Sequence, residues 1–211
     1  MKMTRNARQL LLLCLLLVVA IMMGFVRFSA VGKMGAEVDP ESLLGDPELA
    51  PEFTIRTLDG EELLSETLEG EVVVLDFWAT WCAPCLTEIP HYNEIQKEFE
   101  ESAFKLLGIT VESGNAALVR EFVSKPIPIG GKEHSFEYPI YMGNDKVTDA
   151  YGPLWGYPTT FLIDSNWQIR KRWIGAPAQK AGELHLLIEY LLAQRAGSAV
   201  ADPTGVGANE G

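Results

Sequence analysis

The most hydrophobic part of the chain covers residues 10–26, where seventeen consecutive residues carry no charged side chain. As a helix, such a segment extends for about 25 Å, close to the lower limit for crossing the hydrocarbon core of a bilayer. The alternative is a cleaved signal peptide, whose apolar region is usually shorter and ends at a site of small residues. Here the nearest such site has the bulky Phe28 where a small residue is required. We therefore expect an uncleaved transmembrane anchor over residues 10–26.

Positive charges around this segment predict its orientation. Three basic residues precede it and two follow it: Lys2, Arg5, Arg8, Arg27 and Lys33. Basic residues are enriched on the cytoplasmic side of a membrane helix. We therefore expect residues 1–9 in the cytoplasm, a single-pass cell-membrane protein, and the rest of the chain on the extracytoplasmic (periplasmic) side.

Two further segments show no helical or strand periodicity. Residues 27–50 contain Gly, Pro and several acids, a composition typical of a linker. A partly ordered N-terminal extension packed on the domain is the alternative, and the sequence leaves both open. Residues 196–211 are rich in Gly and Ala and are predicted to be a disordered tail.

Residues 51–195 show the patterns of one folded domain. An alternating segment at 53–58 is followed by Asp59-Gly60, which is a hairpin-turn signal. Residues 71–77 are mostly apolar and show no alternation, which indicates a strand buried on both faces. The other expected elements are a helix over 83–100 containing Pro90, a strand over 104–111, a helix over 115–123, a long loop over 126–137, a strand over 139–142, a short helix over 147–151, strands over 159–163 and 169–173, and an amphipathic helix over 181–194. This order predicts an α/β fold, with a mixed central sheet, helices on both faces and an N-terminal β-hairpin extension.

Composition narrows the possible functions. The net charge is −12, and since residues 1–33 carry +5, the remainder carries −17. Nucleic-acid binding usually requires a basic face, so we expect no nucleic-acid partner. Only three cysteines are present, which excludes a domain held together by many disulfides. Cys14 lies within the apolar segment and is read as a small apolar residue of the membrane helix.

The other two cysteines form the segment Trp81-Cys82-Ala83-Pro84-Cys85, between the expected strand 71–77 and the helix 83–100. A Cys-x-x-Cys pair at a strand-to-helix junction is typical of a redox site. The helix N-terminus favours a thiolate on the first cysteine, and the thiolate is the form that attacks a disulfide. A permanent stabilising disulfide would constrain only a very short loop, and half of a zinc site would lack a second pair.

The residues around this pair resemble those of thioredoxin-fold proteins. The matching residues are 74–85 (VLDFWATWCAPC), Glu88, Pro90 and 156–164 (GYPTTFLID). More narrowly, the chain resembles the TlpA/ResA-like thioredoxins of bacterial envelopes, and the likeness covers about residues 51–194. This resemblance implies the thioredoxin fold and a thiol-disulfide oxidoreductase in which Cys82 is the nucleophile and Cys85 the resolving thiol.

Two acidic residues are candidates for proton transfer. Asp76 ends an apolar run, so burial would raise its pKa and let it accept the proton of Cys85. Its spacing, six residues before Cys82, is similar to that of the buried acid of thioredoxin. A Glu at the position of Glu88 tunes the cysteine pair in ResA-like proteins. The alternatives are a solvated acid at the strand end for Asp76 and a solvated acid in the first helical turn for Glu88.

Three residues are expected to contact the substrate. Pro158 resembles the cis-proline of the family, which would place the Tyr157 backbone opposite the cysteine pair, where a substrate peptide can add as a short strand. Trp81 is expected on an exposed apolar rim, whereas Trp78 is expected in the core. His91, His134 and His185 are expected on the surface, with no resident metal.

The resemblance therefore implies a membrane-anchored enzyme that reduces protein disulfides, for example during cytochrome c maturation or related envelope protein assembly. It implies protein substrates and re-reduction by an integral-membrane thiol-electron donor, and we expect a monomer. No organic cofactor is expected, because the Cys82–Cys85 disulfide itself carries two electrons. The alternatives are a thiol peroxidase-like redoxin and a metal (copper) chaperone that binds its ion through the two cysteines.

Overall fold

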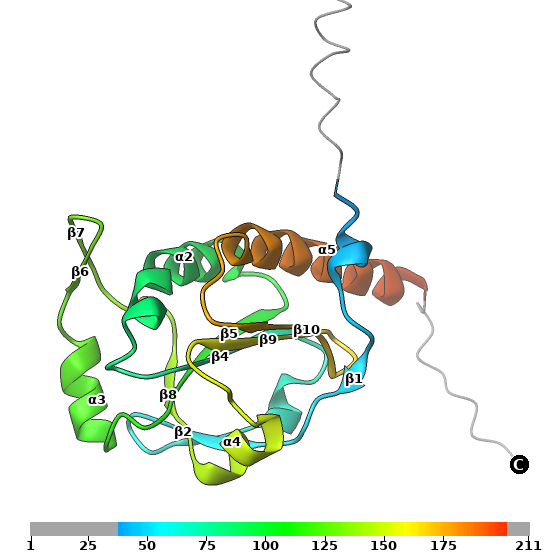
Figure 1. The fold of residues 1–211 in the computed structure, drawn as a ribbon. Coiled ribbons are helices and arrows are strands. Elements are labelled where there is room, and N and C mark those ends of the chain that lie inside the picture. The colour runs from blue at the N-terminus through cyan, green and yellow to red at the C-terminus, as the bar shows by residue number, and fades with distance from the viewer. Residues whose placement is uncertain (1–37, 202–211) are drawn as a thin grey trace, which may run out of the picture. The chain divides into compact units, whose positions relative to one another are not determined.

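The computed structural model describes residues 38–201. Its centre is an eight-stranded mixed sheet (Figure 1). In spatial order the strands are β1 (Glu48–Leu49), β10 (Gln168–Ile174), β9 (Thr159–Ile163), β4 (Val72–Trp78), β5 (Phe104–Thr110), β8 (Ile140–Met142), β2 (Thr54–Thr57) and β3 (Glu62–Leu64). The helices are η1 (Pro40–Leu43), η2 (Ser65–Leu68), α2 (Ala83–Phe99), α3 (Ala116–Val123), α4 (Asp145–Tyr151) and α5 (Lys180–Ala201).

The central strand β4 determines where the site lies. All seven of its residues are buried, Asp76 included, as the absence of an alternating polar face predicts. It pairs in parallel with β5 and antiparallel with β9, so neither of its edges is free. Its C-terminal end leads directly into the Cys-x-x-Cys segment and α2.

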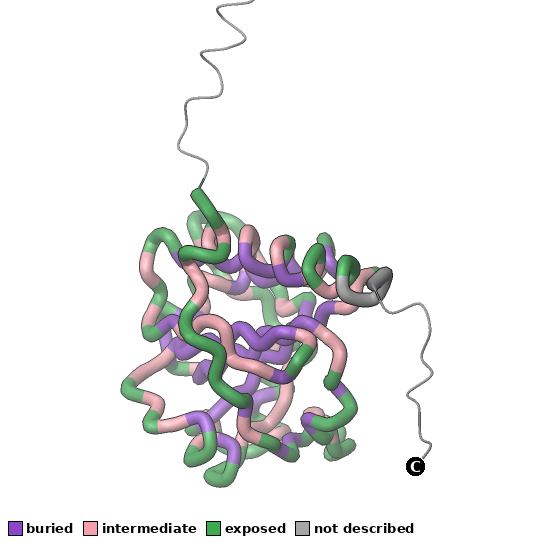
Figure 2. The backbone as a smooth tube through the Cα atoms, turned by 90° about the vertical axis from the view of Figure 1, so that its right-hand side faces the viewer, coloured by how far each residue is buried: buried purple, intermediate pink, exposed green. Residues whose placement is uncertain are grey.

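Alternate residues of β4 face two separate cores, as expected for a sheet covered on both sides. On one face, Val72 and Val74 pack with Leu184 and other residues of α2 and α5. On the other face, Val73 and Leu75 pack with residues of β2, β9 and α4. Figure 1 shows α2 and α5 along one face and α4 on the other, and Figure 2 shows buried residues concentrated between these layers. The predicted thioredoxin-like fold with helices on both faces is therefore confirmed.

The prediction of a long loop over residues 126–137 is wrong in part, because this segment contains a two-stranded hairpin. Strands β6 (Ile127–Ile129) and β7 (Lys132–His134) pair antiparallel. Gly130 and Gly131 form the turn between them with φ of 59° and 79°, the left-handed values that a tight type I′ turn requires. Pro128 obscured the alternation of Ile127 and Ile129, which pack against the α2/α5 core.

Residues 40–50 of the expected linker and residues 196–201 of the expected tail are also more ordered than predicted. Residues 40–50 pack on the domain, because β1 pairs with β10 and the amide of Gly45 donates to the carbonyl of Arg170 over 2.6 Å. The alternative of an ordered extension is therefore correct for this part. Helix α5 continues past its expected end at residue 194 to Ala201. Alanines favour this continuation, and Arg195 donates a hydrogen bond to the carbonyl of Gly70.

The predicted transmembrane anchor over 10–26, the cytoplasmic residues 1–9 and the tail from residue 202 lie outside the described residues. Within residues 38–201, no helix combines the length and the apolar character that crossing a membrane requires. The histidines predicted to lie on the surface (His91, His134 and His185) are each half-buried.

Candidate functional site

The two cysteines lie at the start of α2 and are joined by a disulfide. The S–S distance is 2.03 Å and the Cα atoms are 5.3 Å apart. Cys82 is the N-cap of α2, and its Sγ accepts a hydrogen bond of 3.3 Å from the amide of Cys85. This contact places Cys82 Sγ at the positive end of the helix, where a thiolate is stabilised after reduction.

The turn between β4 and α2 is held by hydrogen bonds from the backbone. The amide of Cys82 donates to the carbonyl of Ala79 over 3.0 Å, and the amide of Thr80 donates to Ser113 Oγ over 3.0 Å. Pro84 lies in the first turn of α2, where its missing N–H costs no intrahelical bond. The local sequence thus begins the helix at the cysteine pair.

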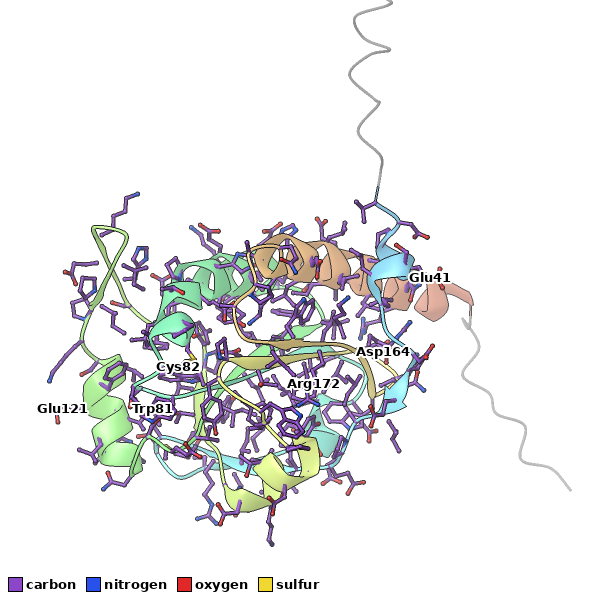
Figure 3. All side chains as sticks on the ribbon, viewed as in Figure 1. Glu41, Trp81, Cys82, Glu121, Asp164 and Arg172 are labelled. Atoms are coloured by element: carbon purple, nitrogen blue, oxygen red, sulfur yellow. A yellow bond between two sulfur atoms is a disulfide. The ribbon has the colours of Figure 1, made fainter. Side chains whose placement is uncertain are left out.

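Trp81 forms the exposed rim of the site, as predicted. Its side chain is 61% exposed, and its Nε1 donates to the carbonyl of Glu112 over 2.9 Å. Its ring meets that of Tyr157 edge-on, with the ring centres 5.8 Å apart. Trp78 is 1% exposed and packs against Phe136, so the two tryptophans have the different environments expected for them. Figure 3 shows Trp81 and Cys82 at one end of the sheet, near α3.

The loop before β9 completes the outer part of the site. The Tyr157–Pro158 peptide is cis, as predicted. Tyr157 packs against the small cluster that contains Cys82 and Cys85, so this loop lies beside the disulfide. A second cis peptide, Gly152–Pro153, was not predicted, because the sequence around it carries no family signature.

Asp76 is buried, which confirms the expectation drawn from its apolar neighbours. It is 2% exposed, and its Oδ1 accepts hydrogen bonds from Tyr92 Oη (2.9 Å) and Thr160 Oγ1 (2.7 Å). Burial raises the pKa of this carboxyl, whereas Lys180 and the two hydrogen bonds oppose the rise. Asp76 is therefore a buried acid that holds its proton at higher pH than an exposed aspartate does.

Glu88 forms an ion pair with a lysine that the sequence did not suggest. Lys180 Nζ lies 2.9 Å from Glu88 Oε2, and the two side chains are 2% and 13% exposed respectively. Burial raises the pKa of Glu88 to about 7; Lys180 lowers it, and the charge of Asp76 raises it further. The alternative of a solvated first-turn acid is therefore wrong.

These residues form what we call the buried polar cluster: Asp76, Glu88, Tyr92, Thr160 and Lys180. Cys85, Glu88 and Tyr92 follow one another at spacings of three and four along α2, so they lie on one helical face. Lys180 Nζ also lies 5.5 Å from the centre of the Tyr92 ring. The cluster therefore continues inward along the helix from Cys85.

Sequence reasoning missed Tyr92, Thr160 and Lys180. The helical spacing of Tyr92 from Glu88 and Cys85 was a usable signal. Lys180 gave no signal, because it is 92 positions from Glu88 and lysines rarely lie buried.

One other group of potential metal ligands occurs among the described residues. Glu98, His185 and Glu189 bring three ligand atoms within 4.8 Å of one another, and none of these residues is buried. The group includes neither cysteine, and Glu98 lies at the opposite end of α2 from the pair.

The cysteine pair is suited to dithiol–disulfide exchange, because an exposed aromatic rim lies outside it and buried acids lie within.

Comparison with known proteins agrees with this geometry. A model of the AhpC/TSA family matches residues 47–172. The thiol-disulfide oxidoreductase ResA of Bacillus cereus is 29% identical over 83% of this chain and 94% of its own length. ResA of Geobacillus thermodenitrificans is 33% identical over 65% of this chain and 74% of its own. The crystal structure of a thiol:disulfide interchange protein of the thioredoxin family from Chlorobium tepidum is 26% identical, with a TM-score of 0.57 over 70% of this chain and 98% of that chain.

Proposed function

This chain belongs to the AhpC/TSA family and is a thiol-disulfide oxidoreductase of the ResA type, and from that premise we propose that it reduces protein disulfides outside the cytoplasm. The observation that carries the proposal is the Cys82–Cys85 disulfide at the start of α2, with the cis-Pro158 loop beside it. In this arrangement an extended substrate can lie next to Tyr157 and Pro158 and present its own disulfide to Cys82.

The proposed cycle begins with the reduced pair. The Cys82 thiolate attacks one sulfur of the target disulfide, and the other target sulfur leaves as a thiolate. Cys85 then attacks Cys82 Sγ, which re-forms the Cys82–Cys85 disulfide and releases the second target thiol. Two electrons pass from the pair to the target, so the chemistry requires no further cofactor.

Proton transfer in this cycle is assigned to the buried polar cluster. Cys85 must lose its proton before it attacks, and a carboxylate with a raised pKa is a suitable acceptor. Asp76 and Glu88 meet this requirement, since burial raises the pKa of both. Lys180 contacts Glu88 and lies near Asp76, so it positions these two groups and limits the rise in their pKa values.

The proposal extends to location and partners. Residues 10–26 would anchor a single-pass protein in the cell membrane, with the redox domain on the extracytoplasmic side. An integral-membrane thiol carrier would return two electrons to the oxidised pair after each turnover. Proteins matured in the envelope, such as apocytochromes c, are the proposed substrates, and the enzyme would act as a monomer.

A trapping experiment tests the reaction. In the Cys85→Ser variant, the mixed disulfide between Cys82 and a target cannot be resolved, so covalent adducts with other proteins are expected on non-reducing gels. The Cys82→Ser variant is the control and should form none. If Cys82 never forms an adduct and the purified chain instead carries a stoichiometric metal, the chaperone alternative replaces this proposal.

The direction of electron flow is tested by equilibrating the chain with glutathione or dithiothreitol buffers. A reductase requires a reducing potential for the Cys82–Cys85 couple, in the range of thioredoxin near −270 mV. A strongly oxidising value, near the −120 mV of disulfide-forming members, would contradict the reductase direction. Reduction of insulin in the presence of dithiothreitol should exceed that of the Cys82→Ser control.

One further candidate is the thiol peroxidase-like redoxin that the sequence left open as an alternative. In that reaction the Cys82 thiolate would attack a hydroperoxide, releasing an alcohol and forming a sulfenic acid, and Cys85 would then displace water to give the same disulfide. Consumption of hydroperoxide by the reduced chain, compared with the Cys82→Ser variant, distinguishes the two activities.

A further inference from the structure

A groove of about 460 Å³ opens beside the cysteine site. We call it the acidic groove and define it by six of its lining residues: Val111, Glu112, Asp145, Asp149, Leu154 and Tyr157. These residues come from the end of β5, from α4 and from the loop that carries the two cis-prolines. The groove is thus built from three separate segments of the chain at one end of the sheet.

The acidic groove is continuous with the proposed exchange site. Tyr157 lines it and also packs against the cluster of Cys82 and Cys85. Glu112 lines it, and its carbonyl accepts the hydrogen bond from Trp81 Nε1. Glu112 has a φ of 50°, a left-handed conformation that is uncommon outside glycine and that often marks a functional position. A polypeptide whose disulfide reaches Cys82 therefore passes close to this groove.

The charge of the groove has one sign. Glu112, Asp145 and Asp149 are exposed, and none of them forms an ion pair with any residue in the described part of the chain. No lysine or arginine is among the residues that line the groove. Some carboxylates elsewhere on the surface do have a basic partner, such as Glu121 with Lys125. The guanidinium of Arg172 donates to the carbonyl of Pro153, a lining residue, over 2.9 Å, but it forms no ion pair with any of the three carboxylates, so their negative charge remains available to a cationic ligand.

The apolar part of the lining suits the same kind of ligand. Val111, Leu154 and Tyr157 contribute apolar surface, and Trp81, whose ring contacts that of Tyr157, is 61% exposed beside it. Lysine and arginine side chains place their aliphatic stems on apolar surface while the charged end reaches polar groups. Their charged ends also interact favourably with the faces of tryptophan and tyrosine rings.

We propose that the acidic groove binds a lysine- or arginine-bearing segment of the substrate polypeptide adjacent to its reactive disulfide, and so makes the enzyme selective for disulfides in cationic segments. This inference rests on the proposed function, since it specifies the substrate class of the same site. Electrostatic complementarity of this kind mainly increases the rate of association and weakens as salt screens it.

The test uses two synthetic peptides with the same disulfide and length, one carrying lysines beside the cysteines and the other carrying glutamines at those positions. The full chain is reduced, separated from the reductant and mixed with each peptide, and kcat/KM or the single-turnover rate constant is measured. The cationic peptide is expected to react about 10-fold faster at low ionic strength, and the ratio should fall towards one as salt increases.

The double variant Glu112→Gln/Asp149→Asn should lower this ratio about 5-fold, since each exposed pair contributes modestly. The double variant Glu100→Gln/Glu101→Gln is the matched control, because it removes two exposed carboxylates at the far end of α2 and should leave the ratio unchanged. Equal rates for both peptides in the natural chain, or a preference that survives in the groove variant, would overturn the inference while leaving the proposed function intact. Failure to reduce either peptide would instead contradict the proposed function.

Discussion

Two groups of carboxylates lie near the Cys82–Cys85 pair, and their surroundings differ. In the buried polar cluster, Asp76 is 2% exposed and accepts two hydrogen bonds, and Glu88 is paired with Lys180. In the acidic groove, Glu112 and Asp149 are exposed and have no basic partner among the described residues. Carboxyl groups at one site are therefore available for two different tasks, the proposed proton transfer and the proposed recognition of the substrate.

The difference follows from solvation. Removing a carboxylate from water disfavours its charged form, so burial raises the pKa of Asp76 and of Glu88, as their proposed role in proton transfer requires. An exposed carboxylate keeps its charge and acts on a partner through its field. The inner acids thus suit the chemistry of the cysteines, and the outer acids suit recognition of the substrate.

The largest expected effect comes from removing the cation of the buried cluster. Lys180→Met leaves Glu88 and Asp76 buried without a positive partner, and breaking a buried pair in this way typically costs about 3–5 kcal/mol of unfolding free energy. Urea titration of the full chain at pH 7.5 measures this loss.

Two further variants determine whether burial causes that loss. Lys125→Met breaks the exposed pair with Glu121, whose side chains are 66% and 65% exposed, and should cost less than about 1 kcal/mol. Glu88→Met/Lys180→Met removes both buried charges and should recover much of the stability. A loss for Lys180→Met no larger than that for Lys125→Met would remove the proposed contrast between the two environments.

The second-largest expected effect is the contribution of Glu88 to the pH dependence of stability. Its pKa is about 7 in the folded chain and 4.5 in the unfolded reference, so the folded state binds the proton more tightly. This contribution is fully present below pH 4.5 and is lost as the pH rises to about 7. The decrease is of the order of 3 kcal/mol, and Asp76 adds to it in the same direction.

Glu88→Gln should therefore flatten the stability profile between pH 4.5 and 8, as measured by urea titrations across that range. Glu121→Gln is the control, because the hydrogen bond and charge of Lys125 lower the pKa of Glu121 and its contribution has the opposite sign. A wild-type profile that rises over this range while Glu88→Gln leaves its slope unchanged would contradict the buried environment of Glu88.

A smaller effect is expected on the rate at which the mixed disulfide is resolved. Asp76→Asn removes a proton acceptor while Glu88 remains, so it should slow the attack of Cys85 by about 100-fold, the low end for a positioned proton acceptor, and the adduct of Cys82 with a fluorescent peptide should accumulate. Asp164→Asn is a matched control: Asp164 is 4% exposed and pairs with Arg170, but Figure 3 shows it far from Cys82. Asp164→Asn should lower stability without slowing resolution, and equal adduct lifetimes in the two variants would contradict the role of Asp76.

These two carboxylate groups also show what the sequence could predict. The inner acids Asp76 and Glu88 were found from local signals, namely an acid that interrupts an apolar run and an offset from Cys85 that matches a family motif. Apolar runs and short-range spacing located β4 and α2, whereas the cis peptide before Pro158 was implied by the family resemblance.

Contacts between distant segments could not be predicted in the same way. Lys180 meets Glu88 only because α5 packs beside α2, and Glu112 and Asp149 line one groove only because the segment after β5 lies on the same groove as α4. The hairpin of β6 and β7 was missed for a local reason, since Pro128 and the two glycines also fit a loop. Tertiary packing thus supplied Lys180 as the partner of Glu88, which the sequence had already suggested, and assembled the acidic groove, which the sequence had not suggested.

The smallest expected effect is on the stability of the acidic groove itself. Glu112→Gln/Asp149→Asn changes two exposed side chains that form no ion pair in the described part of the chain, so the free energy of unfolding should change by less than about 0.5 kcal/mol per site. Each substitution keeps the side-chain shape, and the backbone carbonyl of Glu112 remains available to Trp81 Nε1. Urea titrations of this variant and of Lys180→Met compare directly how much unfolding free energy each change removes. A loss comparable to that of Lys180→Met would mean that the outer carboxylates stabilise the fold, and the division between buried acids for proton transfer and exposed acids for recognition would then be wrong.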